Sequence, residues 1–310
     1  MGGLLGELGK KLAERWLTLL VLPGALYLAV AALARTLGQD HPFAVGRLAG
    51  RIGAWAGAPA AHRPGGQILV LAAVLVGAAA AGVVSQALGS GVERIHLAAD
   101  WPSWPAPARA VAYRMTLRRR RRWRAAAEAW HRHRDEAALA RTRGEHADPT
   151  ARFAARAAMV RISPEHPDRP TWSGDRIHAA SVRVERDHRL DLAALWPHLW
   201  LVLPDTARAE VTSARLALTR ATTLSAWALL YLPLALWWWP AAGIAVVLAL
   251  TGRHRTRSAA DTYATLLEAA TRLYARDLAG PLGVDLPGPL TPEAGGDLGL
   301  RLAPSPPPRP

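Results

Sequence analysis

Four uncharged, apolar stretches constrain this chain of 310 residues more than any other feature. They cover residues 16–34, 67–91, 221–239 and 240–252. A helix rises about 1.5 Å per residue, so about 20 apolar residues are needed to cross the roughly 30 Å hydrocarbon core of a bilayer. The first three stretches meet this length, and the fourth is short. The sequence therefore predicts an all-α integral membrane protein with two transmembrane helical hairpins, four spans in all, and a helical cytoplasmic domain between them.

The stretches and the composition between them divide the chain into five predicted parts. These are an amphipathic N-terminal segment with the first hairpin (1–91), an Arg-rich cytoplasmic helical domain (92–219), the second hairpin (220–257), a cytoplasmic amphipathic helix (258–287) and a Pro-rich disordered tail (288–310). In the Arg-rich domain we expect helices over about 108–143, from Asp148-Pro149 to before Ser163, and from about Thr206 into the third span.

Charge predicts the orientation. The formal net charge is +14, and cytoplasmic segments of membrane proteins collect Lys and Arg. Lys10 and Lys11 before the first span, the run 118–122 and the cluster 253–257 all lie inside if both termini are cytoplasmic. The abundance of Ala, Gly, Pro and Arg is typical of a GC-rich bacterial genome. We therefore expect a multi-pass protein of the bacterial cytoplasmic (inner) membrane.

Two segments leave alternatives open. The outer loop, 35–66, carries four arginines against Asp40 alone, and its stripe from Val45 to Trp55 indicates a short helix. That helix either lies in the membrane interface or is a small buried helix. Pro240 suits the first turn of a returning helix after a tryptophan-rich turn, so 240–252 is predicted to complete a hairpin; a re-entrant segment is the alternative.

One block resembles a known family. It reads Pro170-Thr171-Trp172-Ser173-Gly174-Asp175-Arg176, then Leu190-Asp191-Leu192, then Trp196-Pro197-His198-Leu199-Trp200 and Leu203-Pro204. This is similar to bacterial, often actinobacterial, multi-span membrane proteins that carry Thr-x-x-Gly-Asn/Asp-Arg, Leu-Asp and Trp-Pro-x-Leu-Trp-x-x-Leu-Pro before the third span. His198 replaces the usual Arg, and His188-Arg189 replaces Tyr-Gly. The resemblance implies membrane residence and topology; the family has no assigned activity.

The block has a structural and a functional interpretation. In the structural one, Asp175 caps the next helix and Arg176 pairs with Asp191. In the functional one, the block forms a binding pocket for a headgroup or ligand at the membrane surface. Trp and Arg are favoured both in binding pockets and at bilayer interfaces. The candidate binding residues are Asp175, Arg176, Asp191, Trp196, His198 and Trp200.

The densest positive charge lies between Arg118 and Arg124. Anionic lipid attracts basic segments, so this run is predicted to bind lipid headgroups. The interleaved Trp123 also suits nucleic acid, but no recognition motif accompanies it, and nucleic acid is the disfavoured partner. The predicted lipid-binding residues are Arg118, Arg119, Arg120, Arg121, Arg122 and Arg124.

No pattern of catalytic chemistry is recognisable. The chain has no Cys, and His131 and His133 point to different helix faces, so neither a metal nor any other cofactor is predicted. The spans carry no ionisable group of the kind that pumps use. We therefore expect a non-enzymatic membrane protein whose basic domain binds lipid, a cytoplasmic partner protein or its own copies, as a scaffold, sensor or regulator.

Two other functions stay open. Span 2 has an overlapping small-residue face from Gly77 to Ser85. Such faces let helices approach closely, so span 2 is predicted to pack on span 1 or on an identical span. In the second case the protein would be an oligomeric channel or a membrane-perturbing effector. An enzyme acting on a lipid-linked substrate near the 176–200 block is the third hypothesis.

Overall fold

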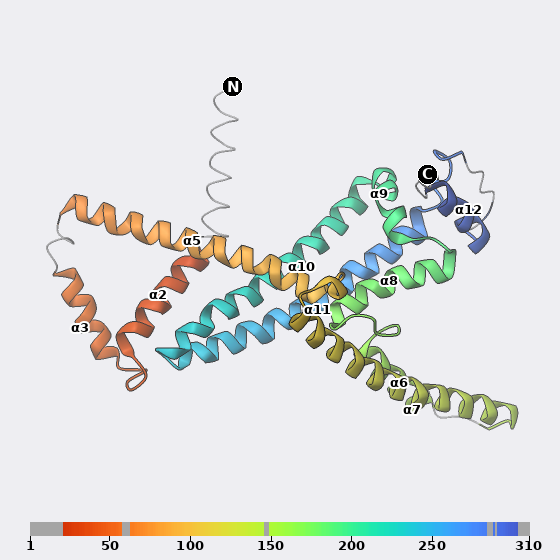
Figure 1. The fold of residues 1–310 in the computed structure, drawn as a ribbon, viewed down its shortest axis with the longest axis horizontal. Helices are drawn as coiled ribbons and strands as arrows, with labels where there is room; N and C mark the ends of the chain where they lie inside the picture. The colour runs from red at the N-terminus through yellow and green to blue at the C-terminus, as the bar shows by residue number, and fades with distance from the viewer. Residues whose placement is uncertain (1–20, 58–62, 146–148, 284–287, 289, 303–310) are drawn as a thin grey trace. The chain divides into compact units, whose positions relative to one another are not determined.

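The computed structural model describes residues 21–57, 63–145, 149–283, 288 and 290–302 (Figure 1). These residues form an all-α protein, as the sequence predicts. The helices are α2 (Leu22–Leu37), α3 (Val45–Ala56), α5 (Pro64–Leu97), α6 (Ala106–Thr142), α7 (Pro149–Ile162), α8 (Trp172–His188), α9 (Leu192–Val202), α10 (Asp205–Tyr231), α11 (Pro240–Tyr274) and α12 (Pro292–Leu302), with short 3-10 turns at Trp101–Ser103 and Leu232–Leu236.

The chain divides into two compact units. The first, here called the apolar unit, comprises Met1–Glu93 and Thr219–His254. The second, here called the basic unit, comprises Arg94–Leu218 and Arg255–Pro310. Each unit is therefore built from two separate parts of the chain.

In the apolar unit, α5 has the length and composition that a bilayer requires. It is the one helix among the described residues that is long and apolar enough to cross a membrane; α2 and α9 are apolar but shorter. The predicted first span begins in residues 16–20, which lie outside the described part of the chain.

The small-residue face of α5 packs against helices of the same chain. A Cβ atom on Gly24 of α2 would lie 2.0 Å from the carbonyl oxygen of Ala78, so only glycine allows this approach. Further along the face, Gly89 lies against Thr223 of α10, whose Oγ1 would be 3.0 Å from an added Cβ. The predicted contact between the first two apolar stretches is therefore confirmed.

The turn between α10 and α11 is held by the loop after α2. Gln39 Nε2 donates to the carbonyl oxygens of Ala235 (2.8 Å) and Leu236 (3.0 Å). The indole of Trp238 donates to the Pro42 carbonyl (3.0 Å). Next to this turn, α2, α10, α11 and the 3-10 turn share one hydrophobic core. Its buried residues are Val30, Trp227, Tyr231, Leu234, Ala241 and Ala245.

The predicted short helix in the outer loop is present as α3. None of its described side chains is buried, and Ile52 is 61% exposed. The alternative of a small buried helix is therefore wrong for the described side chains. Arg47 and Arg51 are also exposed, as an interfacial helix requires.

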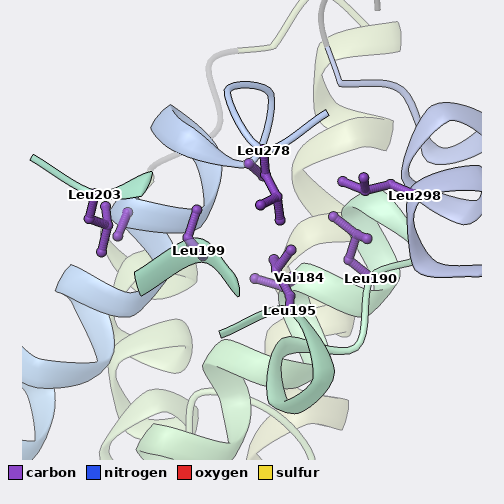
Figure 2. Close-up of a cluster of buried hydrophobic side chains, with 9 residues drawn as sticks. Val184, Leu190, Leu195, Leu199, Leu203, Leu278 and Leu298 are labelled. Atoms are coloured by element: carbon purple, nitrogen blue, oxygen red, sulfur yellow. The ribbon is translucent and has the colours of Figure 1, made fainter. Parts of the chain in front are cut away.

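In the basic unit, α8, α9, α11 and α12 enclose a leucine-rich core (Figure 2). Leu298 of α12 points toward Leu190, next to Val184 and Leu195 in the same cluster. The full buried set is Val184, Leu190, Leu195, Leu199, Leu203, Ala270, Ala275, Leu278 and Leu298. The unit also contains the 37-residue helix α6, against which the 14-residue helix α7 packs.

The helix predictions hold in the middle of the chain and fail near its end. The expected helices at 108–143, from Pro149 and from Thr206 are confirmed as α6, α7 and α10. The helix expected over 258–287 is present as far as Tyr274, but it is the second half of α11, which runs unbroken from Pro240. The disordered tail from Gly288 is wrong where α12 lies, since Leu298 is fully buried; residues 303–310 lie outside the described part.

Candidate functional site: the ion-pair network of α8

The first turn of α8 is built by Thr171 and Gly174. Thr171 has an extended backbone, and its Oγ1 accepts a hydrogen bond from the Gly174 amide (3.1 Å), the geometry of an N-cap. The same hydroxyl donates to the carbonyl oxygen of His96. A Cβ on Gly174 would lie 2.3 Å from the Leu97 carbonyl, so this helix start rests directly on backbone. Thr171, and not Asp175, is therefore the cap.

Asp175 closes the loop that precedes α8. Its Oδ1 accepts from the amides of Asp168 (2.9 Å) and Arg169 (2.8 Å), and its Oδ2 accepts from Nη2 of Arg119 on α6 (2.6 Å). The carboxylate is almost fully buried. Burial raises the pKa of Asp175, and the hydrogen bond and charge of Arg119 partly offset this rise. All of these donors come from the protein itself.

Arg176 joins α8 to α11 through all three of its nitrogens. Nε donates to Asp261 (2.5 Å), Nη2 to the hydroxyl of Thr265 (2.9 Å) and Nη1 to Glu268 (2.7 Å). These acceptors are four and three residues apart, so they lie along one face of α11. The predicted pairing of Arg176 with Asp191 is wrong. Asp191 instead caps α9, where its side chain accepts from the Ala193 amide (2.8 Å).

Further arginines of α8 extend this network. Arg183 donates to Glu165 (3.0 Å) and reaches Glu268 (3.4 Å), so the two carboxylates are linked through one guanidinium. Arg186 donates to Glu165 as well (3.1 Å). Helix α8, the loop before it and α11 are therefore held together by charge-assisted hydrogen bonds, which are roughly twice as strong as neutral ones.

The two tryptophans of α9 lie outside this ion-pair network, beside the leucine-rich core. Trp196 and Trp200 of α9 are half-buried, pack against the leucine core and have ring centroids 5.9 Å apart. His198 is exposed, and its Nδ1 lies 3.2 Å from the Ala194 carbonyl oxygen. The structure therefore divides the six predicted binding residues into an internal ion network, a helix cap and a packed aromatic pair with an outward histidine.

The arginine run of α6 is divided as well. Arg119 is bonded to Asp175 and to the Ile162 carbonyl oxygen (2.6 Å). Arg120 donates to Asp168 (2.6 Å) and to the Pro167 carbonyl oxygen (2.8 Å). The prediction that these two arginines bind lipid needs correction, because both guanidinium groups already bind a carboxylate and a carbonyl oxygen of the protein. The exposed members of the run are Arg118, Arg121, Arg122 and Arg124.

Sequence reasoning missed Glu165, Asp261, Thr265 and Glu268. The three α11 residues lie within the predicted amphipathic helix, 258–287, and their spacing was a signal for one helix face. Nothing local identified Arg176 as their partner. Among the described residues, no group of three His, Cys, Asp or Glu side chains could hold a metal; His146 lies outside them.

Comparisons with known proteins add no relative. No family model, no curated protein and no solved structure matches the chain. The resemblance of the 170–204 block to the bacterial membrane family therefore stays a prediction.

The half-buried His178 of α8 predicts a dependence of stability on pH. Burial and the nearby Arg169 lower the pKa of His178 from 6.5. As pH falls below about 6.5, the unfolded chain takes up a proton that folded His178 resists, so stability is lost on acidification. We expect His178→Gln to flatten the fall in unfolding free energy between about pH 7 and 5, measured by denaturant titration. Exposed His198→Gln is the control; equal slopes in both variants would contradict the prediction.

Proposed function

We propose that the protein is a non-enzymatic, multi-pass protein of the bacterial inner membrane that anchors a basic helical unit on the cytoplasmic side. The exposed apolar surface of α5 carries this proposal. Only 17% of its most apolar 18-residue window is buried, and Ile68, Leu69 and Val76 are each about 70% exposed. The core helix of a soluble protein is mostly buried, and large exposed apolar patches mark interaction or membrane surfaces. Hydrocarbon is the solvent that suits such a helix.

The second pair of apolar stretches supports further spans. Residues 221–252 contain no charged side chain, and Leu236, Val247 and Leu250 are exposed. Trp237 and Trp239 are exposed at the turn, as in the aromatic belt of a membrane interface. Because α11 continues as helix past residue 252, arginines on its next turn can extend to the headgroups and complete a short span.

The packing of the apolar unit supports an anchor more than a channel. An oligomeric pore was predicted to use the small-residue face of α5. Within this chain that face is covered by Gly24 of α2 and Thr223 of α10. The basic unit would then act as a scaffold, sensor or regulator that binds anionic lipid or a cytoplasmic protein.

The network of α8 supports a non-enzymatic role. A catalytic acid or base, or an arginine that binds an anion, needs hydrogen-bonding groups that are directed at a substrate. The hydrogen-bonding atoms of Asp175 and Arg176 are directed at groups of the protein, and both side chains are almost fully buried. Their arrangement suits the joining of helices.

Cysteine labelling tests this proposal directly. The chain has no cysteine, so each introduced thiol is unique. Gly53→Cys on α3 should react with a membrane-impermeant maleimide added outside intact spheroplasts. Ala138→Cys on α6 and Ser258→Cys on α11 should react only after permeabilisation; all three positions are exposed. Extraction of the protein from cells without detergent, or labelling of Ala138→Cys from outside, would contradict the proposed location.

A further inference from the structure

Four arginines of α6 share one helix face. Arg114, Arg118, Arg121 and Arg122 follow the spacing i, i+4, i+7, i+8, which brings side chains to the same side at about 100° per residue. All four are exposed. They are called the arginine face below. The opposite side of α6 holds the buried Ala112, Thr116 and Ala127.

The fold leaves the arginine face without internal partners. In the described part of the chain, no hydrogen bond or ion pair involves these four side chains, whereas Arg119 and Arg120 each bind a carboxylate. No acidic residue occurs between Asp100 and Glu128. The four guanidinium groups therefore lie within about 12 Å along the helix and repel one another unless an anionic surface binds them.

Two apolar side chains lie beside these arginines. Val111 is 57% exposed and Met115 is 47% exposed, and both project from the same side of α6 as Arg118 and Arg122 by helical spacing. Exposed apolar groups among arginines are typical of helices that lie in a membrane interface, where the apolar groups enter the headgroup boundary. A phosphate backbone offers them no comparable contact.

The tryptophan inside the arginine run already makes contacts within the protein. Proteins hold single-stranded nucleic acid by stacking its bases on exposed aromatic rings that lie between basic residues. The indole of Trp123 instead donates to the Ser163 carbonyl oxygen (3.0 Å), and its ring packs edge-on against His166 at 5.6 Å. The arginine face therefore combines positive charge with exposed aliphatic side chains, and the ring of Trp123 is not free to stack on a base.

We propose that the arginine face docks on the phosphate headgroups of anionic phospholipids. This inference rests on the proposed function, since it needs the basic unit to lie beside a membrane. The connection is short: α5 ends at Leu97 and α6 begins at Ala106, so at most about 30 Å of extended chain separates them. Arg119 and Arg120 have a different role, because they hold the loop before α8.

The test uses the full chain in lipid nanodiscs with one fluorescent label. Ala125→Cys places the unique thiol one turn beyond Arg121 on the same face, at an exposed position. In discs with about one-third phosphatidylglycerol, quenching of the label by neutral acrylamide should be at least threefold weaker than in pure phosphatidylcholine discs. About 0.5 M salt should remove this protection, because the contact is electrostatic.

Matched variants separate the arginine face from general charge. Arg118→Gln, Arg121→Gln and Arg122→Gln together should abolish the protection, while the same three positions changed to Lys should keep most of it. The control removes equal charge from exposed arginines elsewhere in the basic unit. Its three substitutions are Arg143→Gln, Arg156→Gln and Arg276→Gln. Unchanged circular dichroism shows that each variant is folded.

Three results would overturn the inference. The first is equal quenching in both kinds of disc, and the second is equal loss of protection in the control variant. The third is protection by single-stranded RNA or soluble glycerol phosphate, added to phosphatidylcholine discs, that matches the protection by phosphatidylglycerol. If the full chain fails to remain with the discs, the proposed membrane function fails as well. If it remains embedded and the label stays accessible, only the arginine face is refuted.

Discussion

Replacing Arg176 by alanine should lower the unfolding free energy of the basic unit by about 3–5 kcal/mol, the usual cost of removing one partner of a buried ion pair. Arg176 and Glu268 are only 8% and 11% exposed in their side chains. Without the guanidinium, the Glu268 carboxylate keeps only the longer contact with Arg183, and Asp261 and Thr265 also lose their donor. The loss can be measured by titrating the detergent-solubilised full chain with denaturant.

Arg208→Ala is the matched control for this measurement. Arg208 also pairs with an aspartate at 2.6 Å, but that partner, Asp205, is 96% exposed in its side chain. Exposed pairs contribute about 0–1 kcal/mol, because water competes for both charges. If Arg176→Ala destabilises the protein no more than Arg208→Ala, the network does not hold α8 to α11. A double change, Arg176→Met with Glu268→Leu, should recover part of the loss, since no charge is then left buried without its partner.

Gly295→Ala should detach α12 from the basic unit. A Cβ at this position would lie 1.8 Å from the carbonyl oxygen of His188, a backbone atom that cannot move aside alone. Detachment exposes Leu298, which is fully buried. The expected cost is about 2–5 kcal/mol, the range found when a buried leucine loses its contacts. Hydrogen exchange over residues 292–302 should rise to the level of an unprotected segment.

The neighbouring glycine provides the control. Gly296 lies on the same helix, and no atom lies within 4 Å of a Cβ added there. Gly296→Ala should leave α12 docked and add up to about 1 kcal/mol of helix stability, because alanine is the better helix former. Similar exchange rates in the two variants would mean that α12 does not pack as described here.

Local signals account for what the sequence predicted correctly. Apolar periodicity, proline positions and charge-free length depend on neighbours within a few turns, so the all-α class and the helices α6, α7 and α10 could be predicted. The apolar stretch that became α5 was identified for the same reason. In contrast, α12 has a glycine-rich sequence with weak helical preference, and its helix is stabilised by docking onto the leucine core.

Only the tertiary structure decided how the charged residues are used. Arg176 meets Asp261 and Glu268 across 85 and 92 residues of chain, and no local pattern specifies a pairing at that separation. In the arginine run, composition alone could not separate Arg119 and Arg120 from Arg121 and Arg122. The seven positions from Arg118 to Arg124 point in every direction around the helix, and the contacts of α6 with the loop before α8 determine which arginines face the protein and which face outward.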